Sequence, residues 1–182
     1  MPRIVVFLIT FVLLLTGGNQ FSYGDPAMKL TSPAFTDGGK IPLPHVMPGA
    51  GGKNVSLPLN WSDAPAGVKS FALSMVDPHP VARNWVHWLA AGIPPEVNSL
   101  AADASGKHMP PGAQEFQNSF GAPGYGGPQP PPGTGDHPYV VTIYALSVPR
   151  LDLGGHPTLA SFQKALEGKI LASATITGYF GR

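Results

Sequence analysis

The chain has 182 residues, of which 12% are charged, and Gly (23) and Pro (22) are abundant. This length is enough for one domain with a hydrophobic core, and so much Gly and Pro excludes a helical bundle and favours a β-rich fold with many turns. The lack of Cys excludes disulfides, thiol catalysis and cysteine-based zinc sites, and a net charge of +1 without any basic run argues against nucleic acid as a partner.

The first residues have the pattern of a secretory signal peptide. Arg3 precedes the apolar run IVVFLITFVLLL (residues 4–15), which is shorter than the roughly 20 residues that span a membrane. Ser22 and Gly24 are small residues placed as in a cleavage site. We therefore expect a signal peptide over residues 1–24, cleavage after Gly24, and a periplasmic or secreted protein. An uncleaved anchor is the alternative.

Residues 25–182 are expected to form a single domain. VSLPLNW (residues 55–61) has the pattern of a strand, and VKSFALSMVD (68–77) is apolar at nearly every position, which predicts a central strand buried on both faces. NWVHWLAAGIP (84–94) predicts a second long strand. Its period of two places Trp85, His87 and Leu89 on one face, and the other face then holds Val86, Trp88 and Ala90.

The second half predicts a long loop, two strands and one helix. Residues 95–138 show little periodicity, and their Pro and Gly content favours an ordered loop that forms a wall. YVVTIYALSV (139–148) predicts a strand and ATITGYF (174–180) another. Between them, Leu159, Phe162, Leu166 and Ile170 have helical spacing after a possible capping residue, Thr158.

Polar residues stand where the long strands begin or end. Asp77 ends the first, Trp85 and His87 lie near the start of the second, and His137 and Tyr139 begin the third. These side chains are expected to meet at one end of the sheet, with the Gly-Pro loop GYGGPQPPPG as a rim. Taken singly, each of them is more often a core residue than a ligand contact.

Several stretches together resemble the phosphatidylethanolamine-binding protein family, in particular its bacterial Raf-kinase-inhibitor-like branch. They are, in order, SPAFTDGGKIP, NVSLPLNWSDAPAGVKSFALSMVDP, WVHW, GYGGPQPPPGTGDHPYVVTIYAL and GKILASATITGYFGR, and they cover about residues 30–182. The resemblance implies a mainly β fold. That fold is a β-sandwich of a large antiparallel sheet and a smaller sheet, with a helix near the C-terminus.

The resemblance also implies a small pocket for anionic headgroups at the end of the sheet. The matching positions are Asp77, His79, Trp85, His87, Gly126, Gly127, Pro128, His137 and Tyr139, with Pro78 as a further wall residue. The family usually has a second acid in its Asp-Pro-Asp-x-Pro segment. This chain reads Asp77-Pro78-His79-Pro80, so His79 stands where an acid is expected.

The residue types fit an anion site. The imidazoles of His87 and His137, the Tyr139 hydroxyl and backbone N–H groups of the Gly-rich rim are expected to donate to a phosphorylated ligand, such as a phospholipid headgroup. Asp77 is expected to orient a histidine, and Trp85 to keep water out. We expect a binding protein rather than an enzyme, with no cofactor and no metal.

Other functions stay open from the sequence. Asp77, His79, His87 and His137 are acceptable zinc ligands in principle, although their spacing matches no known zinc motif, so a metal-dependent or acid–base hydrolase is one alternative. A secreted inhibitor of serine proteases, which would act by surface contact with a protein target, is another. A homodimer is also open.

Overall fold

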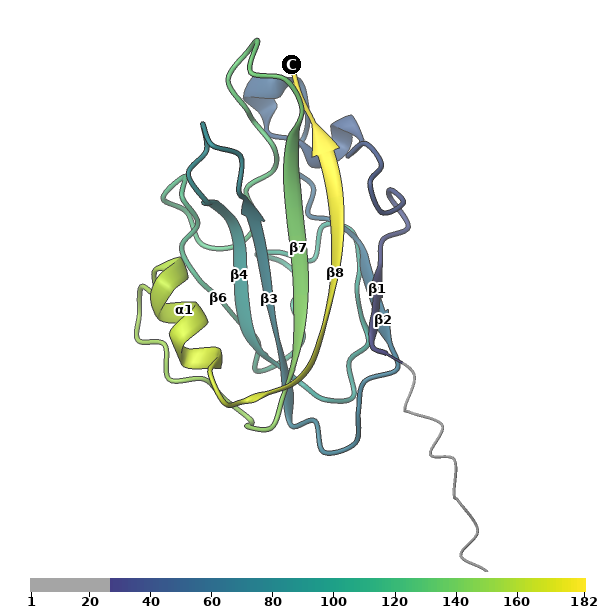
Figure 1. Cartoon of the computed structure of the whole chain (residues 1–182), viewed down its shortest axis with the longest axis vertical. Coiled ribbons are helices and arrows are strands. Elements are labelled where there is room, and N and C mark those ends of the chain that lie inside the picture. The colour runs from purple at the N-terminus through teal and green to yellow at the C-terminus, as the bar shows by residue number, and fades with distance from the viewer. Residues whose placement is uncertain (1–26) are drawn as a thin grey trace, which may run out of the picture.

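The computed structural model describes residues 27–182, so the predicted signal peptide lies outside the described residues. Two antiparallel sheets make up the fold (Figure 1). The large sheet has the order β6 (Gln114–Glu115), β4 (Trp85–Ile93), β3 (Ser70–Asp77), β7 (His137–Leu146) and β8 (Ile170–Phe180). The small sheet has the order β1 (Lys29–Thr31), β2 (Leu59–Ser62) and β5 (Ser99–Leu100). The predicted sandwich with one helix is therefore confirmed.

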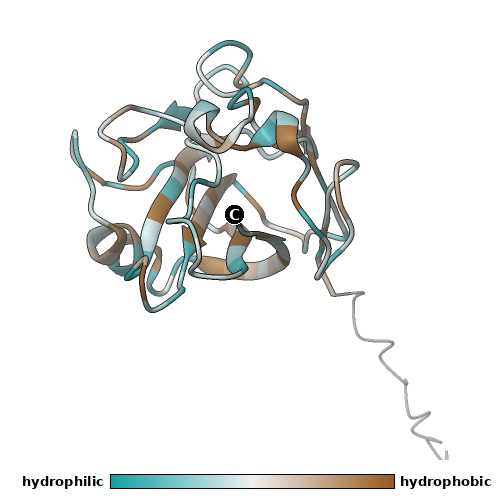
Figure 2. Ribbon diagram, turned by 90° about the horizontal axis from the view of Figure 1, so that it is seen from above, coloured by the Kyte–Doolittle hydropathy of each residue, from teal (hydrophilic) through white to brown (hydrophobic). Residues whose placement is uncertain are grey.

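Strand β3 occupies the centre of the large sheet, as its apolar sequence predicted. Seven of its eight residues are buried, and it pairs with β4 on one side and β7 on the other. The main core lies between the two sheets, where Trp61 from β2 packs against Phe71 from β3 with ring centroids 5.4 Å apart. Figure 2 shows hydrophobic and hydrophilic segments alternating along the strands. Trp61 and Trp88 are both core residues.

Helix α1 (Leu159–Leu166) covers the other face of the large sheet. Thr158 caps it, because its hydroxyl accepts a hydrogen bond from the Ser161 N–H, and Phe162 and Leu166 pack against β3 and β4. The prediction that the helical pattern continues to Ile170 is wrong. Gly168 has a φ of +69° just after the helix, and β8 already begins at Ile170, four residues before the predicted strand. No helix within residues 27–182 has the length and apolar character needed to cross a membrane.

A β-bulge in β4 changes which side chains share a face. Met75 lies opposite Trp88, but its neighbour Val76 lies opposite Val86, so His87 is the extra residue. Beyond the bulge, Trp88 points between the sheets, whereas Val86 and Leu89 pack on the side of α1. The predictions that Val86 shares a face with Trp88, and Leu89 with His87, are therefore wrong. A strict period of two cannot anticipate an inserted residue.

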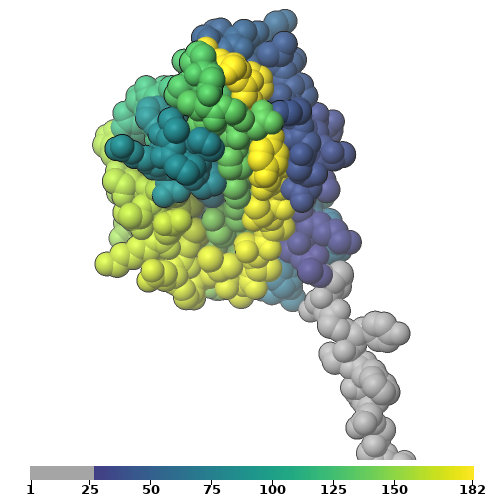
Figure 3. All heavy atoms as spheres, turned by 45° about the horizontal axis from the view of Figure 1, so that its top comes forward, coloured from purple at the N-terminus to yellow at the C-terminus, as the bar shows by residue number. Residues whose placement is uncertain are grey.

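Several loops gather at one end of the large sheet. Figure 3 shows the segments near residues 45, 80 and 130 beside the C-terminus at this end. The Arg182 side chain donates from Nε to the Pro130 carbonyl (2.6 Å) and from Nη1 to the Gly49 carbonyl (2.6 Å). His45 is buried in the short 3-10 helix Leu43–His45, with its Nδ1 2.8 Å from the Val55 carbonyl. The loops at this end are thus held together by hydrogen bonds.

Candidate functional site

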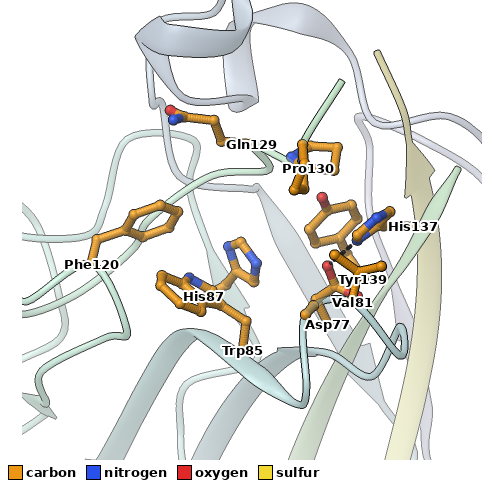
Figure 4. Close-up of a pocket in the computed structure, with 11 residues that line it drawn as sticks. Asp77, Val81, Trp85, His87, Phe120, Gln129, Pro130, His137 and Tyr139 are labelled. Atoms are coloured by element: carbon orange, nitrogen blue, oxygen red, sulfur yellow. Dashed lines mark hydrogen bonds and ion pairs between the residues drawn. The ribbon is translucent and has the colours of Figure 1, made fainter. Parts of the chain in front are cut away.

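A cavity of about 330 Å³ opens at this end of the large sheet (Figure 4). This volume is within the usual range for small-molecule sites. Five of the predicted site residues line it, and they come from the ends of β3, β4 and β7: Asp77, Trp85, His87, His137 and Tyr139. The remaining lining residues come from the loops: Val81, Ala82, Phe120, Gln129, Pro130 and Pro131. These strand-end side chains therefore meet at one cavity, as expected.

The floor of the cavity contains a buried chain of hydrogen bonds. The Asp77 carboxylate accepts from Nδ1 of His137 (2.6 Å) and, through its other oxygen, from the backbone N–H of His79 (2.9 Å). Nε2 of His137 lies 2.9 Å from the Thr134 hydroxyl, which also donates to the Pro131 carbonyl (2.8 Å). Each oxygen of Asp77 therefore accepts one hydrogen bond, and the carboxylate holds the His137 ring in place.

His79 stands beside the cavity and does not line it. Its ring stacks on that of His137, with centroids 3.8 Å apart and an interplanar angle of 20°. Its Nδ1 accepts from the Val81 N–H at 3.3 Å. His79 thus holds the turn after β3 and covers one face of His137.

His87, Tyr139 and the amide of Gln129 are the polar lining groups that remain for a ligand. Nδ1 of His87 donates to the Gly126 carbonyl at 2.5 Å, and its ring lies edge-on to Tyr139 with centroids 5.0 Å apart. Burial lowers the pKa of His87 to about 4, against the opposing effects of the Gly126 carbonyl and the Asp77 charge. The Tyr139 hydroxyl is buried and has no hydrogen-bond partner among the described residues. Burial, and then the charge of Asp77, raise the pKa of Tyr139.

Within the Gly-Pro segment, Gln129, Pro130 and Pro131 line the cavity, whereas Gly126, Gly127 and Pro128 do not. The N–H of Gly126 donates to the His87 carbonyl (2.8 Å) and that of Gly127 to Oδ1 of Asn54 (2.7 Å), while the Pro128 carbonyl accepts from Met47. The prediction that these N–H groups face a ligand is therefore wrong, because the protein already uses them. Gly126, Gly127 and Pro128 position His87 and join two loops. Pro78 lines a different, shallower hollow on the α1 side of the sheet.

The mouth of the cavity is more apolar than the sequence indicated. Val81, Trp85 and Phe120 line it and remain exposed at 51%, 38% and 37%, and the Trp85 and Phe120 rings lie edge to face at 5.3 Å. Sequence reasoning missed Val81 and Phe120. Each is a lone apolar side chain within a polar, turn-rich segment, and this pattern could have indicated an exposed apolar contact.

Metal ligation receives no support from the arrangement of these groups. Within residues 27–182, no group of three or more His, Asp or Glu side chains is placed to hold a metal ion. His87 directs Nδ1 at a carbonyl, and His137 uses both ring nitrogens.

Comparison with known proteins agrees with the fold. Residues 31–181 match the sequence profile of the family described as phosphatidylethanolamine-binding protein. The chain is 38% identical to the UPF0098 protein YbhB of Escherichia coli over 84% of this chain and 99% of that protein. The crystal structure of Escherichia coli YbcL, described as a member of the mammalian PEBP family, has a TM-score of 0.81 at 33% identity and covers 86% of this chain and 99% of its own.

A third relative is the putative lipoprotein LppC of Mycobacterium tuberculosis, which is 38% identical over 84% of this chain and 72% of its own length. The chain belongs to the phosphatidylethanolamine-binding protein family. The family name refers to binding rather than to catalysis.

Proposed function

We propose that this is an exported binding protein whose cavity takes a small oxyanion, such as the phosphate group of a headgroup or of a soluble phosphorylated compound. The observation that carries the proposal is the Tyr139 hydroxyl, which lines the cavity and has no partner among the described residues. A buried hydroxyl without a partner costs about 1–3 kcal/mol, so a ligand oxygen that accepts from it recovers this energy.

The surroundings of Tyr139 favour an oxyanion over a cation. Asp77 is the carboxylate that lines the cavity, and both of its oxygens already accept hydrogen bonds. The carboxylate is also only 4% exposed, so an ammonium group would have little access to it. The apolar mouth formed by Val81, Trp85 and Phe120 excludes water, which strengthens each hydrogen bond made inside.

Titration with phosphate and with phosphoethanolamine, followed by NMR, tests this proposal. The ring signals of His87 and Tyr139 should shift in a saturable manner, and Trp85 at the mouth provides a second readout through fluorescence. The Tyr139→Phe variant should bind at least about tenfold more weakly, because it lacks the hydroxyl donor. Unchanged His87 and Tyr139 signals at saturating phosphate would rule out the oxyanion site.

Export rests on two observations. The apolar segment at residues 4–15 has the length of a signal-peptide core, and the related LppC is named a lipoprotein. Mass spectrometry of protein from cells that express the full chain should find a mature chain that begins at Asp25. A full-length chain retained in the cytoplasm would contradict export.

A further inference from the structure

Arg182, which follows the end of β8, fastens the wall of the cavity. Its Nε donates to the Pro130 carbonyl (2.6 Å) and its Nη1 to the Gly49 carbonyl (2.6 Å). Its backbone carbonyl also accepts from the Gly133 N–H (2.9 Å). Pro130 lines the cavity, whereas Gly49 belongs to the short 3-10 helix Pro48–Ala50. A planar guanidinium that bonds two loops in this way has a fixed place, so its positive charge is fixed as well.

The charge of Arg182 reaches the hydroxyl of Tyr139. In the large sheet Tyr139 pairs with Gly178, so the chain brings Arg182, a few residues further on, to the same end of the sheet. In Figure 4 the Tyr139 hydroxyl points to the side of the cavity where Pro130, a hydrogen-bond partner of Arg182, lies. Burial and then the charge of Asp77 raise the pKa of Tyr139, and the charge of Arg182 opposes both. The guanidinium therefore acts on the atom that the proposed ligand contacts.

Among the residues that the structure describes, no Lys or Arg side chain lines the cavity, whereas the carboxylate of Asp77 does. The charge of Asp77 repels an oxyanion, and a positive charge held near the wall offsets this repulsion. Lys40, another basic residue beside β8, forms an ion pair with Asp136. Arg182 bonds to carbonyls, and within residues 27–182 no carboxylate forms an ion pair with it. Its charge is therefore the one available to a ligand behind the Pro130 wall.

We propose that Arg182 sets the affinity of the cavity for oxyanions: it fixes the Pro130 wall and places a positive charge beside the bound ligand. This inference rests on the proposed function and assigns it a further residue. Arg182 does not line the cavity, so it is a positioning residue that also acts through its electric field. Because the Coulomb energy is proportional to the charge of the ligand, the contribution of Arg182 should grow with that charge.

Sulfate and methanesulfonate separate the effect of charge from that of shape. Both present oxygens on sulfur, but at about pH 7 sulfate is a dianion and methanesulfonate a monoanion. By calorimetry on the mature chain, Arg182→Gln should weaken methanesulfonate binding about threefold and sulfate binding about tenfold, as expected for a charge that is partly screened by solvent. The loss of a merely structural support would weaken both anions by the same factor, and this result would overturn the role of the charge.

Arg150→Gln is the matched control. Arg150 is exposed and follows the opposite end of β7, so the variant removes the same charge far from the cavity. Both affinities should change less than about twofold.

Arg182→Lys separates the charge from the hydrogen bonds. It keeps the charge, but an ammonium lacks the planar fork that bonds both carbonyls. The variant should weaken both anions by a similar factor and keep their affinity ratio within about twofold of the wild type. A ratio that changes as much as in Arg182→Gln would overturn the assignment.

Urea unfolding establishes whether Arg182→Gln is folded. If it is not, NMR of the wild type provides the test, because the Nε–H of Arg182 that donates to Pro130 gives a signal of its own. This signal should shift saturably with sulfate, with the same dissociation constant as the signals of Tyr139. An unchanged Nε–H signal would overturn the inference.

The outcomes separate this inference from the proposed function. If neither anion binds the wild type, oxyanion binding itself is wrong, and the role of Arg182 with it. If both anions bind and Arg182→Gln behaves as Arg150→Gln does, oxyanion binding stands and the role of Arg182 is wrong.

Discussion

The same Tyr→Phe substitution at two buried tyrosines should change the free energy of unfolding in opposite directions. Tyr139 and Tyr125 are exposed by only 0% and 6%, and both belong to the main core. The Tyr125 hydroxyl donates to the His45 carbonyl at 2.7 Å, whereas that of Tyr139 has no partner among the described residues. Replacement by Phe removes one oxygen in each case, so the loss of volume is the same.

The expected changes in the free energy of unfolding differ in sign. Tyr125→Phe breaks a buried hydrogen bond and leaves the His45 carbonyl unpaired, which should cost about 1–2 kcal/mol. Tyr139→Phe removes a hydroxyl that is buried at a cost, so the ligand-free protein should keep its stability or gain up to about 1 kcal/mol. The gap of about 2 kcal/mol corresponds to roughly 4–8 °C in Tm for a domain of this size.

Urea unfolding of both variants, without ligand and then with saturating phosphate, measures this difference. Phosphate should stabilise the wild type and Tyr125→Phe by the same increment, and Tyr139→Phe by less, because ligand binding adds stability in proportion to affinity. If Tyr139→Phe loses as much ligand-free stability as Tyr125→Phe, its hydroxyl has a partner within the protein. A ligand oxygen would then meet no unpaired hydroxyl at this position.

Three further predictions concern the supports of the cavity. Gly127→Ala should lower the free energy of unfolding by about 2–4 kcal/mol in thermal unfolding, because a Cβ there would lie 2.2 Å from the His45 carbonyl oxygen. The control Gly155→Ala has no atom near its Cβ and should change little. Equal losses in the two variants would contradict this. The unfolded chain protonates His87 near pH 6.5 but the folded protein only near pH 4, so the protein should lose about 3 kcal/mol of stability from this group as the pH falls across that window. Urea titrations of His87→Gln should lack that part of the loss, and an identical pH dependence would refute it. Phe162→Ala should cost about 3–5 kcal/mol by circular dichroism melting, because its ring is fully buried between α1 and the sheet; a loss below 1 kcal/mol would show that α1 is dispensable.

The sequence predicted the central strand of the large sheet well, because its apolar pattern fits few other positions in a fold. VKSFALSMVD is apolar on both faces, and only the middle of a sheet that is covered on both sides accommodates such a strand. Ile170 shows where this reasoning fails. It continues a helical spacing, but pairing with Leu146 and the turn at Gly168 place it in β8 instead.

The sequence predicted the candidate site in part: five of the nine predicted residues line the cavity, and His79, Gly126, Gly127 and Pro128 do not. Asp77, His87, His137 and Tyr139 stand at strand ends, and strand pairing alone brings them together. Which atoms point into the cavity depends on the bulge at His87 and on the path of the Gly-Pro segment. Neither leaves a periodic pattern, so the sequence could not show that the backbone N–H groups of that segment are already bonded.

The bond between Asp77 and His137 joins residues 60 positions apart, and this separation bears on how the protein acquires its function during folding. Strands β3 and β4 are joined by a short turn and can pair as a local hairpin, but β7 must close a long loop before it reaches β3. Until β7 docks, Tyr139 and His137 are far from His87, and the cavity does not exist. Binding competence should therefore emerge late in folding, only once β7 has docked on β3.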